Sequence, residues 1–69
     1  MNAEEFRECL NTMGWHWTRV ADLTGINPRT VSRWYAGSIA VPEDVGGPLA
    51  AISTAMHQAL EAHPLPYRG

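Results

Sequence analysis

The chain has 69 residues, a formal net charge of −2 and 45% hydrophobic residues, a composition that predicts one small globular domain and argues against a disordered chain. The single cysteine, Cys9, excludes an intrachain disulfide and a zinc site built from cysteines. No apolar run approaches the roughly 20 residues of a membrane span, and no signal-peptide pattern opens the sequence, so we expect a cytoplasmic protein. Because so short a chain has a small core, oligomerisation is the support we expect for it.

The first predicted helix runs from Asn2 to Met13. Asn2 can cap this helix, and a glycine follows it at position 14. Four apolar side chains share one face at helical spacing, namely Phe6, Cys9, Leu10 and Met13. We therefore expect Cys9 to lie in the core rather than to act as a nucleophile.

Two further helices are predicted over residues 17–24 and about 28–36. A glycine follows each of them, at positions 25 and 37, and Asn27 followed by Pro28 is typical of a helix start. Trp15 lies between the first helix and the second, and its side chain is expected to fill part of the core.

The last predicted helix runs from Pro48 to about Ala62. Gly46, Gly47 and Pro48 are expected to interrupt the helical pattern, so the residues before them are predicted to form only one short turn, over 42–46.

The two prolines at positions 64 and 66 cannot continue this helix, which predicts a flexible tail over residues 63–69. No strand pattern is present. The predicted fold is therefore all-α, with four to five helices in one domain over residues 1–62.

The last helix carries two apolar stripes. The first is expected to complete the core and consists of Leu49, Ile52, Met56, Ala59 and Leu60. The second lies beside it and consists of small residues, Ala51, Ala55 and Ala62. Two adjacent stripes exceed what one small core needs, so we predict a homodimer whose interface includes the three alanines and Met56. The alternative is that the second stripe reflects only the helix propensity of alanine.

Positive charge gathers in residues 16–38. Three of the five arginines lie there against one acidic residue, Asp22, which gives a net charge of +2. The rest of the chain has two arginines against six acidic residues, a net charge of −4. A positive face with an acidic back is suited to orienting a small protein on a polyanion such as DNA.

The third predicted helix is amphipathic. Val31 and Trp34 point to one side, and Arg29 and Arg33 lie almost opposite them. Thr30, Ser32 and Ala36 flank the two arginines. An ordinary surface helix would show the same pattern, so the pattern alone does not indicate a binding function.

Five residues around this helix have the spacing of a known motif: Ala21, Gly25, Ile26, Val31 and Trp34. Their spacing resembles the helix-turn-helix of the Cro/repressor-like (XRE) DNA-binding family, with the motif at about residues 17–36. The likeness covers roughly residues 5–52, and its most specific part is "RTVSRWYAGSIAVPEDV". That run also looks like small phage-borne regulators, including those that repress anti-CRISPR operons.

The resemblance implies that the third helix enters the major groove of DNA. It places Arg29, Arg33, Thr30 and Ser32 where the family contacts base edges. It places Ser38 where a phosphate is usually held, and we expect Arg19, Trp17, His16 and Tyr35 to contact phosphate as well. Trp17 stands where the family often has glutamine. Its side chain is equally expected to be partly buried against the core instead of contacting phosphate. For His16, capping of the second helix is the other reading.

The resemblance and the charge pattern together predict a transcriptional repressor that binds an inverted repeat in double-stranded DNA as a dimer. The alternative is a protein-binding adaptor or inhibitor that uses the same scaffold without DNA. We expect no enzymatic activity, cofactor or small-molecule ligand, because no nucleophile–base pair and no glycine-rich phosphate loop is present. We expect no metal site, because His57 and His63 lack carboxylate or cysteine partners at ligand spacing.

Overall fold

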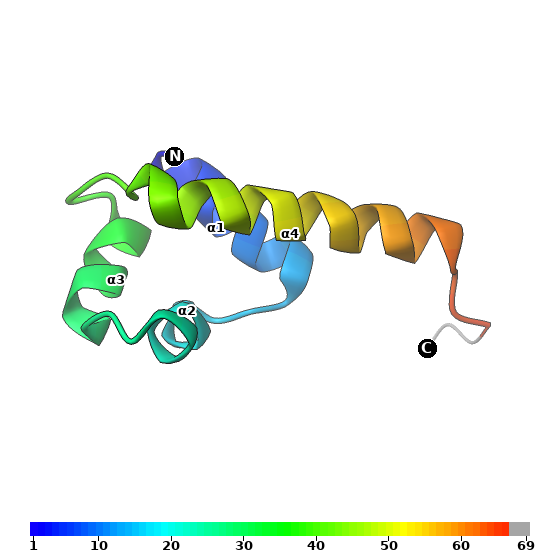
Figure 1. Cartoon of the computed structure of the whole chain (residues 1–69), viewed down its shortest axis with the longest axis horizontal. Coiled ribbons are helices and arrows are strands. Elements are labelled where there is room, and N and C mark those ends of the chain that lie inside the picture. The colour runs from blue at the N-terminus through cyan, green and yellow to red at the C-terminus, as the bar shows by residue number, and fades with distance from the viewer. Residues whose placement is uncertain (67–69) are drawn as a thin grey trace.

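The structure is a computed structural model and describes residues 1–66. This part of the chain folds into four helices and contains no strand: α1 (Ala3–Met13), α2 (Trp17–Thr24), α3 (Pro28–Ala36) and α4 (Glu43–Ala62). Figure 1 shows α1 behind the first half of α4 and α2 and α3 below it, while the second half of α4 extends beyond them. The prediction of an all-α fold is confirmed. The predicted tail includes residues 67–69, which lie outside the described residues.

Side chains before each of the first three helices satisfy backbone groups that have no partner inside the helix. At α1, the backbone amide of Glu5 donates to Asn2 Oδ1 over 2.8 Å, and the Glu5 carboxylate accepts from the backbone amide of Asn2, which completes a capping box. At α3, the Arg29 amide donates to Asn27 Oδ1 over 2.9 Å, and Pro28 stands at the first helical position, where no amide hydrogen is needed. These local signals explain why both helices begin where the sequence predicts.

The predicted break before the last helix is wrong, because α4 is continuous from Glu43 to Ala62 with Pro48 inside it. Pro48 has no backbone N–H to donate to the Asp44 carbonyl, so one hydrogen bond of the helix is lost. Asp44 is an exposed residue, so this loss occurs at the surface. Gly47 has no Cβ, which relieves the clash that normally keeps the residue before proline out of the helical conformation. Gly46 is buried, and a Cβ there would lie 3.0 Å from the Met1 Cβ, so glycine permits close packing at this point.

The core takes residues from all four helices. Phe6, Leu10, Val20 and Val31 are its largest fully buried side chains. Around them lie Met13, Ala21, Trp34, Val41 and Leu49, and half-buried Cys9 and Trp15 pack against this cluster. In this core α1 contacts both α3 and α4, and α2 contacts α3. The orientation of α3 is therefore set by α1 on one side and by α2 on the other.

The stripe that was expected to complete the core does so only in part. Leu49 is buried and Met56 is half-buried, but Ile52 is 43% exposed, Leu60 is 53% exposed, and Ala59 is exposed. A helix of 20 residues is about 30 Å long, and the other three helices cover only its first half. Gly46, Leu49 and Ser53, at i, i+3 and i+7, are the buried residues of α4. Glycine and serine do not reveal a core position in an apolar pattern, so this face was missed.

Candidate nucleic-acid interface

Helices α2 and α3 are joined by a tight turn that begins at Gly25. Gly25 has φ +71° and ψ 9°, a left-handed conformation that glycine adopts without steric cost. The Thr24 hydroxyl donates to the Val20 carbonyl over 2.7 Å and accepts from the Ile26 amide over 3.2 Å. One side chain thus ties the end of α2 to the start of the turn.

The inner face of this helix pair is closely packed. Ala21 is 5% exposed, Val31 is fully buried and Trp34 is 2% exposed, while Ile26 is half-buried against the core. Together with Gly25, these are the residues whose spacing suggested a helix-turn-helix. Their packing leaves the opposite face of α3 free of contacts to the core.

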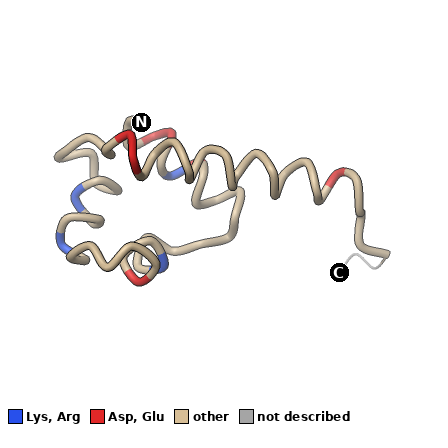
Figure 2. Tube along the Cα trace, viewed as in Figure 1, with Lys and Arg blue, Asp and Glu red and all other residues tan. Residues whose placement is uncertain are grey.

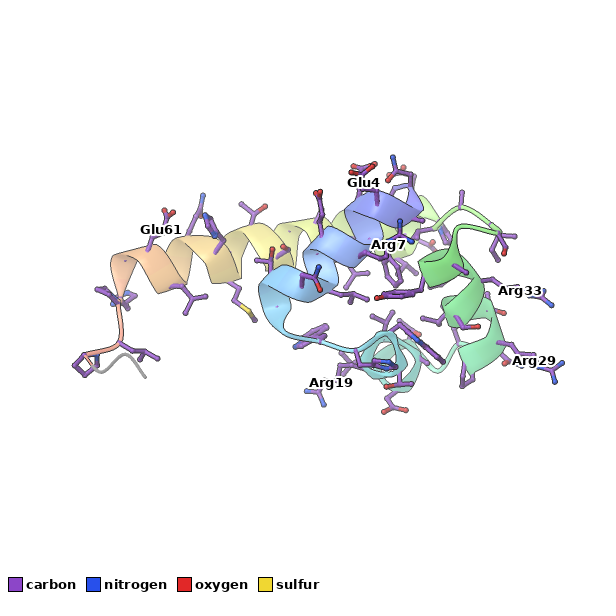
Figure 3. All side chains as sticks on the ribbon, turned by 180° about the vertical axis from the view of Figure 1, so that it is seen from behind. Glu4, Arg7, Arg19, Arg29, Arg33 and Glu61 are labelled. Carbon is purple, nitrogen blue, oxygen red and sulfur yellow. The ribbon has the colours of Figure 1, made fainter. Side chains whose placement is uncertain are left out.

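Arg29 and Arg33 lie on that opposite face. Both are exposed, and Figure 3 shows them extending from α3 toward the same side of the molecule. No ion pair among residues 1–66 involves either arginine, and α3 contains no acidic residue, as Figure 2 shows. The structure therefore presents two guanidinium groups, one helical turn apart, to any ligand that approaches α3.

The two hydroxyl residues expected beside the arginines are less accessible. Thr30 and Ser32 are both half-buried. The Ser32 hydroxyl donates to the Arg29 carbonyl over 2.9 Å, so its proton is already used within the helix. Only the acceptor side of the Ser32 oxygen remains for a ligand.

The residues expected to contact phosphate do not all lie near Arg29 and Arg33. In Figure 3, Arg19 extends away from the side to which they point. Its guanidinium carbon lies 5.6 Å from the centre of the Trp15 ring, the geometry of a cation–π contact. The structure thus brings two of the three arginines of residues 16–38 to one face and leaves Arg19 apart from them.

His16 and Trp17 stand together at the start of α2. The ring nitrogen Nδ1 of His16 accepts from the Thr18 amide over 3.3 Å, so His16 caps the helix, which is one of its two predicted roles. The ring centres of His16 and Trp17 are 5.2 Å apart. Trp17 is half-buried and packs against the core. Both predicted roles of Trp17 are compatible with this partial exposure.

Ser38 follows α3 and is exposed. Its amide donates to the Arg33 carbonyl over 2.9 Å, and the Gly37 amide donates to the same carbonyl over 3.0 Å. Both amides close the end of the helix, as in a common C-cap in which Gly37 is left-handed. A phosphate next to Ser38 would therefore accept a hydrogen bond from the side-chain hydroxyl, because the backbone amides of Gly37 and Ser38 already donate to the Arg33 carbonyl.

Sequence reasoning missed a contact that involves Arg7 of α1. The Arg7 Nη1 group donates to the Tyr35 carbonyl over 2.9 Å, and its guanidinium carbon lies 5.8 Å from the centre of the Tyr35 ring. The Tyr35 side chain, which was expected near phosphate, is 40% exposed. The two residues are 28 positions apart, and no local pattern in the sequence relates them.

Sequence reasoning also missed an apolar pocket of about 160 Å³ between α2 and α4. Its wall on the side of α2 includes Trp15, Val20 and Leu23, and its wall on α4 includes Val45, Pro48, Leu49 and Ile52. Leu23 is 59% exposed at its rim. Two residues that were expected in a short turn, Asp44 and Val45, line this pocket as part of α4.

The three alanines of the predicted dimer interface, Ala51, Ala55 and Ala62, are exposed on α4. The fourth member, Met56, is half-buried against the core. Most of the proposed interface is thus open to a partner, and Met56 already has contacts within the chain.

The expectation that His57 has no carboxylate partner is wrong. His57 Nε2 lies 3.0 Å from Glu61 Oε1, one helical turn away on exposed α4. No group of three or more potential metal-ligating side chains occurs among the residues that the structure describes.

None of the four helices in residues 1–66 is both long and apolar enough to cross a bilayer. No protein-family model, curated protein or solved structure matches this chain.

Proposed function

We propose that this chain is a sequence-specific DNA-binding regulator that reads base edges with the exposed face of α3. The observation that carries the proposal is the division of α3 into two faces. Val31 and Trp34 anchor the helix in the core, and Arg29 and Arg33 project on the opposite side with no ion-pair partner among residues 1–66. The major groove of B-DNA admits one α-helix, and arginine can donate two hydrogen bonds to O6 and N7 of guanine.

The charge distribution supports an approach with this face first. Residues 16–38 have a net charge of +2, and the rest of the chain has a net charge of −4. Two of the three arginines in residues 16–38 are Arg29 and Arg33 on the exposed face of α3, so the phosphates of DNA attract this face. Because the chain contains only five basic residues, we expect few phosphate contacts and weak binding to unrelated DNA.

We further propose that two copies bind one inverted repeat and repress transcription by occupying it. The exposed surface of α4 supports pairing, since Ala51, Ala55 and Ala62 share one face of the helix and all three are open to solvent. Two α3 helices that enter successive major grooves stand about 34 Å apart, which places half-site centres about 10–11 bp apart. The likeness of residues 29–45 to small phage-borne regulators of anti-CRISPR operons makes DNA upstream of the protein's own gene the first target to test.

A mobility-shift titration with this upstream DNA over a series of salt concentrations tests the proposal. The parent protein is expected to bind, with an affinity that falls steeply as salt rises. An Arg29→Ala/Arg33→Ala double variant that folds normally is expected to lose the preference for this DNA over unrelated DNA of equal length. A parent protein that shifts neither DNA, or a double variant that keeps the full preference, would contradict the proposal.

A protein-binding adaptor is the second candidate, and the pocket between α2 and α4 is the observation that favours it. An apolar pocket with Leu23 and Ile52 exposed at its edges suits an apolar side chain of another protein. This candidate predicts no DNA shift at any salt concentration. It also predicts that Leu23→Ser impairs function in cells while Arg33→Ala does not.

A further inference from the structure

Helix α1 holds the C-terminal end of α3 through three neighbouring contacts. A Cβ added at Gly37 would lie 3.4 Å from the Ala3 Cβ, which shows how closely the two helices approach there. One turn along α1, the Phe6 ring meets the Trp34 ring, and the next residue, Arg7, reaches Tyr35. Residues 3, 6 and 7 share one face of α1, so this face forms a platform for the end of α3.

Arg7 supplies a hydrogen-bond donor to one carbonyl of the last turn of α3. The Arg33 carbonyl accepts from the Gly37 and Ser38 amides, and the Trp34 carbonyl accepts from the Gly37 amide. The Tyr35 carbonyl accepts from Arg7 Nη1 over 2.9 Å. A positive charge at this end of the helix also interacts favourably with the helix dipole. Among the side-chain hydrogen bonds within residues 1–66, this is the one that joins two helices.

The Arg7 guanidinium also contacts the side chain of Tyr35. Its carbon lies 5.8 Å from the centre of the Tyr35 ring, within the range of a cation–π contact. Arg7 is half-buried, whereas Arg29 and Arg33 are exposed. Arg7 therefore interacts with both the backbone and the ring of Tyr35, and it differs in surroundings from the two arginines that point outward.

We infer that Arg7 is a positioning residue for DNA recognition, which sets the angle at which α3 meets the groove. This inference rests on the proposed function. The start of α3 is held independently by the Asn27 cap and the turn after α2, so loss of the Arg7 contact affects mainly the opposite end, where the contacts made by Phe6 and Ala3 remain. Arg33 lies near that end, and Arg29 lies near the start. Without Arg7, recognition by Arg33 is impaired more than recognition by Arg29.

Arg7→Gln tests this role, and Arg19→Gln is the matched control because it also removes one arginine. The probe is the DNA sequence that the parent protein selects from a randomised pool, compared with unrelated DNA of equal length. We expect Arg7→Gln to lower the ratio of the two affinities about three- to tenfold per half-site, mainly at the base pair that Arg33→Ala identifies. Arg19→Gln is expected to leave the ratio unchanged. Arg7→Lys replaces Arg7→Gln if the latter does not fold, with a smaller loss expected at the same base pair.

Three outcomes would overturn the inference. An equal loss of affinity for both DNAs, with a salt dependence reduced by about one ion, would identify Arg7 as a phosphate contact instead. A lower melting temperature with an unchanged affinity ratio in the folded variant would identify a purely structural role. An equal loss of preference at all base pairs would contradict a selective effect on Arg33. Failure of the parent protein to select any sequence would instead overturn the proposed function, so the two failures are separate observations.

Discussion

The rings of Phe6 and Trp34 meet edge to face, with centres 6.1 Å apart and planes at 89°. Such pairs are stabilising beyond the apolar area that they bury. Phe6 is fully buried, and Trp34 is 2% exposed. This contact joins α1 to α3 at the centre of the small core, and it fixes the inner face of the helix whose outer face carries Arg29 and Arg33.

Trp34→Ala is expected to unfold the domain. Truncation of a buried tryptophan costs about 3–5 kcal/mol, and a chain of this length has a total stability of about 3–10 kcal/mol. Thermal unfolding followed by circular dichroism measures the loss. Leu23→Ala is the control, because Leu23 is 59% exposed and its truncation is expected to cost about 0.5 kcal/mol or less. A Trp34→Ala protein that melts within a few degrees of the parent would show that this contact is not central to the core.

Gly25→Ala is expected to weaken the turn between α2 and α3. Gly25 has φ +71°, and the left-handed conformation costs other residues about 1–2 kcal/mol. No heavy atom lies within 4 Å of the position that a Cβ would occupy, so the cost arises from the backbone alone. Gly25→Asn separates backbone strain from other effects, because asparagine tolerates this conformation better than alanine does. We expect melting temperatures in the order glycine, asparagine, alanine, from highest to lowest, and equal values for the two variants would contradict this explanation.

Arg33→Ala is expected to cost about 1–3 kcal/mol of binding free energy per half-site and to relax the preference at one base pair. Affinity for unrelated DNA is expected to change little, because a base contact contributes mainly to discrimination. The same is expected of Arg29→Ala at a neighbouring base pair. Arg19→Ala is the comparison, since a phosphate contact there would lower affinity evenly on all sequences. If the Arg29 and Arg33 variants fold and bind the selected DNA as the parent does, neither arginine reads bases.

Ala55→Glu is expected to disrupt dimerisation, because it introduces a charge into the predicted interface on exposed α4. Light scattering at micromolar concentration is expected to give twice the 7.6 kDa mass of the monomer for the parent and the monomer mass for the variant. Ala50→Glu, at an exposed position on another side of the same helix, is the control and is expected to remain a dimer. A monomeric parent, both with and without DNA, would contradict the dimer.

The first three helices could be predicted because their ends carry strong local signals. Asn2, Asn27 and the glycines at 14, 25 and 37 act within a few residues of their own positions. The course of α4 could not be predicted in this way. Gly46, Gly47 and Pro48 oppose a helix locally, but packing of Gly46 against Met1 favours one. Tertiary contact decided the outcome there.

The candidate site was predictable to the same degree. The two faces of α3 follow from helical periodicity, so the exposure of Arg29 and the burial of Trp34 could be anticipated. The contact between Arg7 and the Tyr35 carbonyl could not, because it joins distant positions through a backbone atom that every residue has. The direction of Arg19 depends on its contact with the Trp15 ring, which no periodic pattern specifies.

Selection of DNA from a randomised pool by the parent protein tests most directly whether α3 reads bases. The expected result is one enriched sequence, an inverted repeat with half-site centres about 10–11 bp apart and with guanines whose enrichment disappears in the Arg29→Ala and Arg33→Ala proteins. A pool that remains random after repeated selection at moderate salt, or an enriched sequence that both variants select unchanged, would contradict this function of α3.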